Sequence, residues 1–459
     1  MPDEKTEDID LIVNHPKKAV NKLALPVMVS FIFIMINNVI DSIWVSGLGP
    51  NPLAAVGFIT PLFMAFIGFA NGLGAGANSL ISRYIGAEDY ENATNSAIHA
   101  IVLGFVVTVI STIFVLIILK PLLLIMGAGD VINETMTYGN IIIGGSYSVF
   151  MPATMAAVFR AQGDVKRASY PLILNALINI VLDPIFIYVI GWGIAGAAFS
   201  TVLSATLQAI PMVYWMFIKR DNFLKIRMDK YKTNLKIYKD ILVVGVPASF
   251  EQFIISFVSI LFNYWITILG GTVAVAAYTA TWRLVSMGMS PITSIGIATL
   301  TVGGAAYGAR NLLNLKTALN YGVKLGMICS IIVCLSFFIF AQPLSFIFSY
   351  SANSAVLSSN IVEALHILCF FILFMPFGVM AGNIFQAMGN GTMALFLTIL
   401  RSFIMEVLFG GLFAFILGFG LAGLYTGMVF GMATGSIIGY VHLIFYLRNH
   451  EDYFTGQVN

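Results

Sequence analysis

Charge is scarce in this sequence. Asp, Glu, Lys and Arg make up 10% of the 459 residues, whereas 59% are hydrophobic. A soluble domain carries roughly a quarter of charged residues, so the composition excludes that class. Repeated apolar runs of about twenty residues or more instead predict a protein that crosses a membrane many times.

Cysteine and histidine are also few, and motifs for nucleotide and metal chemistry are missing. The three cysteines (Cys329, Cys334, Cys369) all lie in apolar runs without zinc-site spacing, so we expect small buried side chains. The sequence has neither GxxxxGK[ST] nor HExxH. We therefore expect no enzyme and no cofactor, and neither ATP nor nucleic acid as a partner.

Twelve apolar segments are long enough to span a bilayer, which predicts an all-α integral membrane protein. Nearly all of the 23 Lys and Arg fall in alternate connections, which predicts both termini in the cytoplasm of a protein of the cell (plasma) membrane. The segments lie at about 22–46, 54–82, 94–119, 135–158, 169–190, 194–217, 240–268, 276–302, 317–341, 356–385, 394–417 and 421–446.

One long charged connection divides the chain near its midpoint into two sets of six spans. We interpret it as a solvated linker whose positive charge holds the topology. The predicted parts are a polar cytoplasmic tail (1–16), an N-lobe (17–218), the basic cytoplasmic linker (219–239), a C-lobe (240–447) and a cytoplasmic C-terminal tail (448–459).

The two halves repeat each other. Pro26 and Pro247 open matching helices 221 residues apart, and FRAQGD at 159–164 matches FQAMGN at 385–390 at an offset of 226. IGAEDYENA and YGARNLLNL match at an offset of 222, and GIAGAA and GLAGLY at 227. Because six spans per half is an even number, both halves enter the membrane from the same side, so the repeats are parallel. Such repeats are typical of secondary transporters.

Polar residues interrupt two of the apolar runs in the first half. Asp41 lies well inside its run, one helical turn after Asn37, and Asn175, Asn179 and Asp183 are spaced four apart. A charge inside a membrane helix costs a few kcal/mol and normally faces a cavity or a partner. We expect the two polar faces to line one wet cavity, the alternative being a structural polar network.

The repeat indicates that these polar residues are not needed for folding. At the offsets given above, Asp41 corresponds to Phe262, Asn179 to Met405 and Asp183 to Phe409. The second half has its own charges within spans, for which ion pairing and function both remain open: Glu251, Arg283, Glu363, Arg401 and Glu406. Of these, Glu251 and Arg283 are secondary site candidates, together with Asn37 and Asn175 of the first half.

Several of these stretches carry a family resemblance. DxIWVSGLG at Asp41, the NIVLDPIFIY run, FRAQGD and the paired repeats resemble a multidrug and toxic compound extrusion (MATE) transporter, of the DinF-type branch of archaea and bacteria. The resemblance implies two six-helix lobes of the MATE / MOP-flippase type, and efflux of organic cations driven by protons or sodium. Matched residue by residue, it implies a first-lobe polar site made of Asp41, Asn179, Asp183, Tyr138 and Thr201.

The mechanism that we expect is proton-coupled antiport by alternating access. Two carboxylates close together in a low dielectric resist being ionised at once, so Asp41 and Asp183 are expected to take up a proton and release a cationic drug. Pro26 and Pro184 are expected hinges, because proline removes a backbone hydrogen bond. We expect the substrate to be held by apolar and aromatic surface. The expected partners are small-molecule drugs and membrane lipid, and the protein is expected to be a monomer.

Sodium is the rival coupling ion, with hard oxygen ligands from Asp41, Asn179, Asp183 and Thr201. A lipid-linked oligosaccharide flippase is the alternative function, but it needs several cationic side chains in its cavity and only Arg283 and Arg401 are candidates. A membrane enzyme or receptor is a further class, and no catalytic constellation supports it.

Overall fold

The computed structural model describes residues 7–219, 221–226, 231–349 and 357–455. Within these ranges every regular element is a helix. This outcome follows from the apolar composition, because a segment in hydrocarbon must satisfy its own backbone N–H and C=O groups, and a helix does so within one segment.

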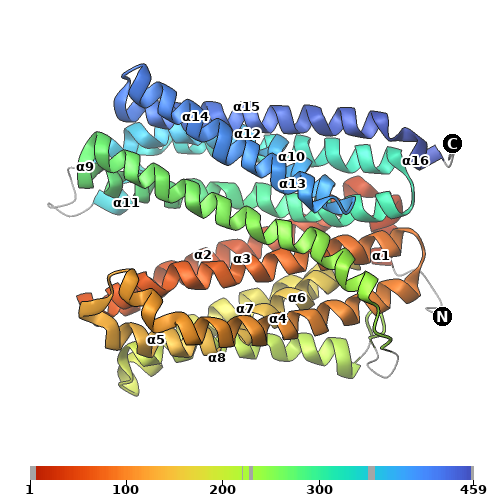
Figure 1. Cartoon of the computed structure of the whole chain (residues 1–459), viewed down its shortest axis with the longest axis horizontal. Helices are drawn as coiled ribbons and strands as arrows, with labels where there is room; N and C mark the ends of the chain where they lie inside the picture. The colour runs from red at the N-terminus through yellow and green to blue at the C-terminus, as the bar shows by residue number, and fades with distance from the viewer. Residues whose placement is uncertain (1–6, 220, 227–230, 350–356, 456–459) are drawn as a thin grey trace. The chain divides into compact units, whose positions relative to one another are not determined.

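The α-helices are labelled in Figure 1. In chain order the helical elements are α1 (Glu7–Asn14), α2 (Pro16–Ser46), α3 (Pro50–Gly86), α4 (Tyr90–Ile125), η1 (Gly129–Val131), α5 (Ile132–Gly144), α6 (Tyr147–Ala161), α7 (Val165–Pro184), η2 (Ile185–Val189), α8 (Gly193–Val213), η3 (Tyr214–Lys219), α9 (Leu235–Gly308), α10 (Leu312–Ile339), α11 (Ala341–Ser349), α12 (Leu357–Ala387), α13 (Gly391–Thr398), η5 (Ile399–Met405), α14 (Glu406–Gly411), η6 (Leu412–Ile416), α15 (Gly420–Asn449) and α16 (Glu451–Thr455).

The element α9 consists of two helices that meet at Gly271, whose φ of 65° lies in the left-handed region that favours glycine. Counting Leu235–Gly271 and Val273–Gly308 separately, the described residues contain twelve helices that are long and apolar enough to cross a membrane. The predicted all-α membrane fold with twelve spans is confirmed.

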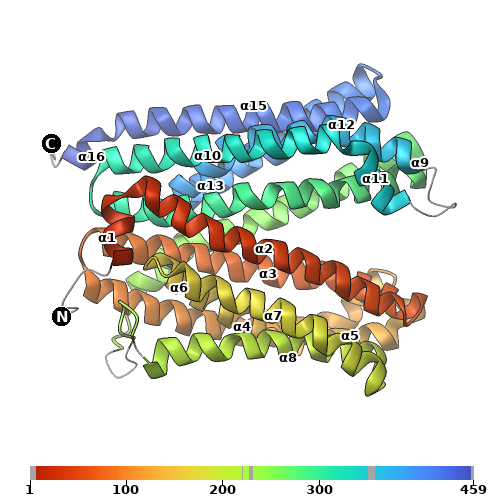
Figure 2. The ribbon, with the colours of Figure 1, turned by 180° about the vertical axis from the view of Figure 1, so that it is seen from behind.

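The chain divides into two compact units. The first contains Leu25–Ser249 and the described residues up to Asp10; in it α3 packs on α4 and α6, and α7 packs on α8 (Figure 1). The second contains Leu11–Ala24 and the described residues from Phe250 onward. In it α12 packs on α10 and α15 (Figure 2), and α14 packs on α15 (Figure 1). The lobe limits expected from the sequence stay a prediction.

The repeated motifs have the same local conformation in both halves. In FRAQGD, Gly163 has φ 85° and the Asp164 side chain caps α7 by accepting a hydrogen bond from Arg167 N. In FQAMGN, Gly389 also has φ 85° and Asn390 caps α13 through Met393 N. The sequence repeat is therefore a repeat of helix-starting turns.

The segments expected as tails and linker contain helical structure. Helix α1 lies in the predicted N-terminal tail, and its Ile9 and Ile12 are buried. Helix α9 begins at Leu235, inside the predicted linker, and α16 lies in the predicted C-terminal tail. Residues 1–6, 220, 227–230 and 456–459 of these segments lie outside the described residues.

Candidate ion-coupling site

Two helices of the first unit supply the predicted polar residues. Asn37 and Asp41 lie one turn apart on α2, and Asn175, Asn179 and Asp183 lie one turn apart in succession on α7. The spacing of four residues thus puts each set on one helical face, as predicted.

A chain of hydrogen bonds joins the two helices. Asn37 Nδ2 donates to Asn179 Oδ1 at 2.9 Å, and Asn179 Nδ2 donates to Asp183 Oδ1 at 2.9 Å. Asp183 is fully buried, and Ser200 on α8 also donates its hydroxyl to Asp183 Oδ1. The Asp41 carboxyl group lies within hydrogen-bonding reach of the Asp183 carboxyl group.

Some oxygens around this pair accept no hydrogen bond from any described residue. They are Asn37 Oδ1, Asn175 Oδ1 and Asp183 Oδ2. A buried acceptor without a donor is uncommon in a folded protein, and its partner is usually a water or an ion. The site thus contains two carboxyl groups that contact each other. It also contains amide oxygens that can still accept a hydrogen bond or coordinate an ion.

The other two predicted site residues differ in their contacts. Tyr138 on α5 is buried, and its phenol is close enough to Asp41 and Asp183 to interact electrostatically with both. The Thr201 hydroxyl instead donates to Ala197 O in its own helix, at 2.9 Å. Ser200, which was not predicted, makes the contact with Asp183. Spacing on α8 alone does not distinguish the two, because the choice depends on how α8 is rotated against α7.

Both predicted hinges lie within helical structure. Pro26 is inside α2, where Ser30 Oγ donates to Pro26 O at 2.8 Å and to Ser169 O at 3.1 Å. Pro184 ends α7 and is followed by η2, a π-helical turn. Such turns often occur at functional sites.

The WVSG motif fits against this turn. Tyr188 in η2 donates its hydroxyl to Trp44 O at 2.5 Å. A Cβ atom at Gly47 would lie 2.2 Å from the Tyr188 hydroxyl oxygen, so a larger residue there would displace the tyrosine side chain. The end of α2, which carries Asp41, is therefore fixed to the turn that follows Asp183.

Two of the secondary candidates, Glu251 and Arg283, lie in the second unit. Glu251 Oε1 accepts a hydrogen bond from Gln386 Nε2 at 3.0 Å, and Arg283 is exposed on α9. Glu406 donates its backbone N–H to Arg401 O across the π-helical η5.

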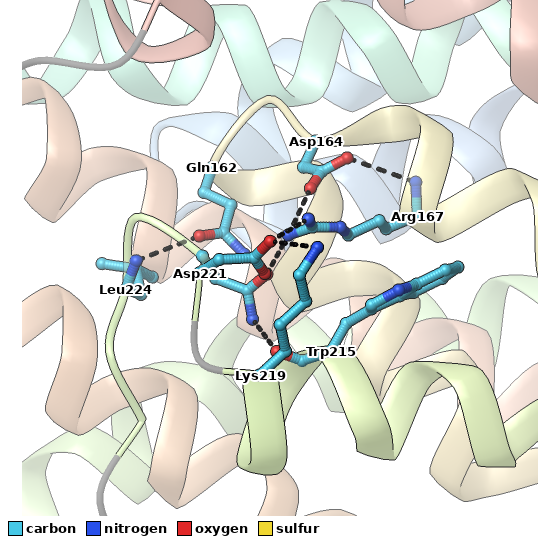
Figure 3. A network of polar contacts seen from close by, with 8 residues as sticks. Gln162, Asp164, Arg167, Trp215, Lys219, Asp221 and Leu224 are labelled. Atoms are coloured by element: carbon cyan, nitrogen blue, oxygen red, sulfur yellow. Dashed lines mark hydrogen bonds and ion pairs between the residues drawn. The ribbon is translucent and has the colours of Figure 1, made fainter.

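A second polar network ties the start of the linker to the turn before α7 (Figure 3). Arg167 Nη2 and Lys219 Nζ both contact Asp221 Oδ2 at 2.8 Å, and Arg167 Nη1 lies 3.3 Å from Asp164 Oδ2. Gln162 Oε1 accepts from Leu224 N at 3.1 Å. This network anchors the first linker residues to the repeated FRAQGD motif.

The pKa values of the two carboxyl groups in this network shift in opposite directions. Partial burial raises the pKa of Asp221, but Lys219 and Arg167 together outweigh it and hold that pKa below its usual value. Burial raises the pKa of Asp164 above its usual value despite the adjacent Arg167.

In the described residues no three or more His, Cys, Asp or Glu gather in a way that could hold a metal ion.

Comparisons with known proteins agree with this architecture. The model of the family described as MatE matches residues 26–185 and 247–412, which covers most of the chain and both repeats. The chain belongs to the MatE family. It is therefore a MATE transporter rather than an enzyme, and the predicted family is confirmed, whereas the DinF-type branch stays a prediction.

Individual relatives align over much of the chain. The "Probable multidrug resistance protein YoeA" of Bacillus subtilis is 29% identical over 66% of this chain and 66% of its own length. The "Multidrug export protein MepA" of Staphylococcus aureus is 24% identical over 86% of this chain and 88% of its own length. A solved structure described as the "Outward-facing conformation of a multidrug resistance MATE family transporter of the MOP superfamily" is 36% identical, with a TM-score of 0.94, and the match covers 97% of this chain and 99% of that one.

Proposed function

We propose that this MATE transporter is a cation-coupled antiporter that exports amphipathic organic cations and other xenobiotics by alternating access. The names of YoeA and MepA, a multidrug resistance protein and a multidrug export protein, support the export of drugs. We further propose that it acts as a monomer in the plasma membrane with both termini in the cytoplasm, as the distribution of Lys and Arg predicts.

The contact between Asp41 and Asp183 is the observation that carries the proposal. Two carboxylates in contact repel each other unless a proton or a cation lies between them. The donors to Asp183 Oδ1 are the neutral groups of Asn179 and Ser200, which do not cancel the second negative charge. The pair therefore has a reason to bind one positive charge from outside the protein.

Binding of that charge couples to movement of α2 and α7. When both carboxylates are ionised, they attract a cationic drug into the N-lobe; when a coupling cation neutralises them, the drug loses that attraction and is released. Pro26 and Pro184 supply places where α2 and α7 can bend between the two states.

The coupling ion that we propose is the proton. A proton suffices to bridge two carboxyl groups, and the membrane gradient drives it inward. Sodium is the rival at the same site, because carboxylate, amide and hydroxyl oxygens are ligands for hard cations. The unpartnered Asn37 Oδ1 and Asp183 Oδ2 are the atoms that would coordinate it.

Dye efflux from proteoliposomes tests the proposal. Wild type, Asp41→Asn and the repeat-matched control Phe262→Leu are compared under a pH gradient alone and under a sodium gradient alone. We expect pH-driven efflux in wild type and Phe262→Leu and none in Asp41→Asn. Full coupled efflux by Asp41→Asn would refute the site, efflux driven only by sodium would refute the proton, and no efflux by wild type under either gradient would refute the function.

A further inference from the structure

His99 is a buried histidine that the transport site does not use. It lies on α4, with no exposed surface. All its described partners belong to α4 or to the segment that connects the two halves of the chain, and all lie in the first compact unit.

Both ring nitrogens of His99 have a partner with a fixed role. Nδ1 lies 2.8 Å from Asn95 O, which can only accept, so Nδ1 carries the hydrogen. Asn234 N, which can only donate, lies 2.9 Å from Nε2, so Nε2 must offer its lone pair. These partners assign a neutral imidazole protonated at Nδ1.

The residue that His99 holds is the N-cap of α9. Asn234 accepts a hydrogen bond from Lys236 N on its side-chain Oδ1 at 3.0 Å and from Ile237 N on its backbone oxygen at 3.1 Å. Its own N–H is the group that donates to His99. The imidazole therefore completes the helix start and fastens it to α4.

Two tyrosines enclose the imidazole. The Tyr231 and Tyr238 rings lie with centroids 4.9 Å and 4.6 Å from that of His99, and their hydroxyl oxygens are 2.6 Å apart. Asn95 Nδ2 adds a contact to Lys232 O at 3.5 Å. The anchor thus consists of α4 residues on one side and residues 231–238 on the other.

We propose that His99 is an acid-sensitive anchor, which holds the start of α9 on α4 while neutral and releases it when protonated. A protonated imidazole has no lone pair for Asn234 N–H, so that hydrogen bond is lost. It also places a positive charge at the N-terminal end of a helix, where a cation is unfavourable. Histidine is the side chain whose ordinary titration range makes such a switch effective near physiological pH.

The surrounding groups favour the neutral form in the anchored state. The titratable side chains whose rings lie against that of His99 are Tyr231 and Tyr238, and neither is a carboxylate. Lys232 and Lys236 are cationic residues of the described part of the connecting segment. Tyr84 on α3 interacts electrostatically with Asp240 on α9 and with Asp89 and Arg83. No contact described between residues of the structure brings a carboxylate to the His99 ring.

The direction of the pH effect follows from this arrangement. Anchoring is complete where imidazole is neutral and weakens as pH falls below about 6.5, the ordinary pKa of a free histidine. If only the released form binds the proton, a fall from pH 7.5 to 5.5 increases its population relative to the anchored form about tenfold. Acidification on the linker side is therefore what frees α9.

Hydrogen–deuterium exchange of the full-length protein in nanodiscs tests this inference without a transport assay. Exchange of the amides in residues 231–240 is measured at pH 7.5 and 5.5 and corrected for the intrinsic pH dependence. We expect about tenfold faster corrected exchange at pH 5.5 in wild type. Equal corrected exchange at the two pH values would overturn the proposal.

Two variants separate titration from packing. In His99→Gln an amide oxygen can accept from Asn234 without titrating, so the pH effect should fall below about twofold. His442→Gln, which removes a histidine of α15, should keep the wild-type response. A tenfold response that persists in His99→Gln would contradict the role of the imidazole.

Discussion

The two repeats carry different side chains at matching positions of their helices: carboxylates in the first unit and phenylalanines in the second. In the first unit Asp41 and Asp183 meet between α2 and α7, with Ser200 donating from α8. At the repeat-related positions of the second unit lie Phe262, which is buried against Trp265, and Phe409, which contacts Phe413 and Phe430.

The position related to Ser200 shows the same contrast. At an offset of 227 it corresponds to Gly427, where a Cβ atom would lie 2.4 Å from Phe409 O. In the second unit the helices approach closely through a glycine, whereas in the first a serine hydroxyl bonds to a carboxylate across the same contact. The helix-starting turns are alike in both units, whereas the polar atoms that meet Asp183 in the first unit have no counterpart at the related positions of the second.

The largest expected effect tests that difference directly. Asp183→Asn keeps the side-chain volume but removes the second negative charge, so gradient-driven dye efflux should fall at least about tenfold. Phe409→Leu, at the matching position, should stay within about twofold of wild type. Equal losses in the two variants would mean that the pair serves packing rather than coupling.

Next in size is an exchange of the small residue between the units. Gly427→Ser gives the second unit the residue that the first has, but it forces a side chain against Phe409 O and should destabilise by about 1–3 kcal/mol. Gly439→Ser is the control, because a Cβ there meets only Leu397 side-chain carbons, at 3.5 Å or more. A lower Tm for Gly427→Ser alone is the expected result in detergent.

A smaller effect is expected at Ser200 itself. Ser200→Ala removes one of the two neutral donors to Asp183 Oδ1, so the carboxylate should bind the coupling cation more tightly, by roughly three- to tenfold. Thr201→Val is the matched control, because that hydroxyl bonds within α8. The half-saturating cation concentration for drug release measures the shift, and an equal shift in both variants would assign no special role to Ser200.

The smallest effect concerns the surface network near the linker. Because the pKa of Asp221 is held below its usual value, the pairing stabilises the protein above about pH 4 and is lost as pH falls through the lowered value. Asp221→Asn should cost less than about 1 kcal/mol at pH 7, and less still at high salt.

A single ion pair in the second unit provides the comparison for Asp221. Lys316 Nζ lies 2.9 Å from Glu451 Oε1, and both side chains are well exposed. Glu451→Gln should lower Tm less than Asp221→Asn, because Asp221 has two cationic partners. An Asp221→Asn penalty that is larger at pH 3 than at pH 7 would contradict the sign of the shift.

Much of the fold and part of the site could be predicted from the sequence. Apolar runs determine spans because hydrocarbon forces helices. A spacing of four residues determines a shared helical face, so the sequence alone pairs Asn37 with Asp41 and Asn179 with Asp183.

Other contacts depend on geometry that spacing does not contain. Ser200 and Thr201 are adjacent, and only the rotation of α8 against α7 decides which hydroxyl reaches Asp183. The His99 contact joins residues 135 positions apart through a connecting segment without regular periodicity. The helical start of α9 at Leu235 lies in a stretch whose charge pattern is typical of a linker.

The most direct test of the central claim is a count of protons released when a cationic drug binds. Purified wild type and Asp41→Asn are titrated with the drug in weakly buffered detergent solution at neutral pH, and the released protons are measured. If the Asp41 and Asp183 pair exchanges a proton for the drug, wild type releases protons in proportion to the drug bound and Asp41→Asn releases none. Undiminished release by Asp41→Asn, or drug binding by wild type without release, would contradict proton coupling at this pair.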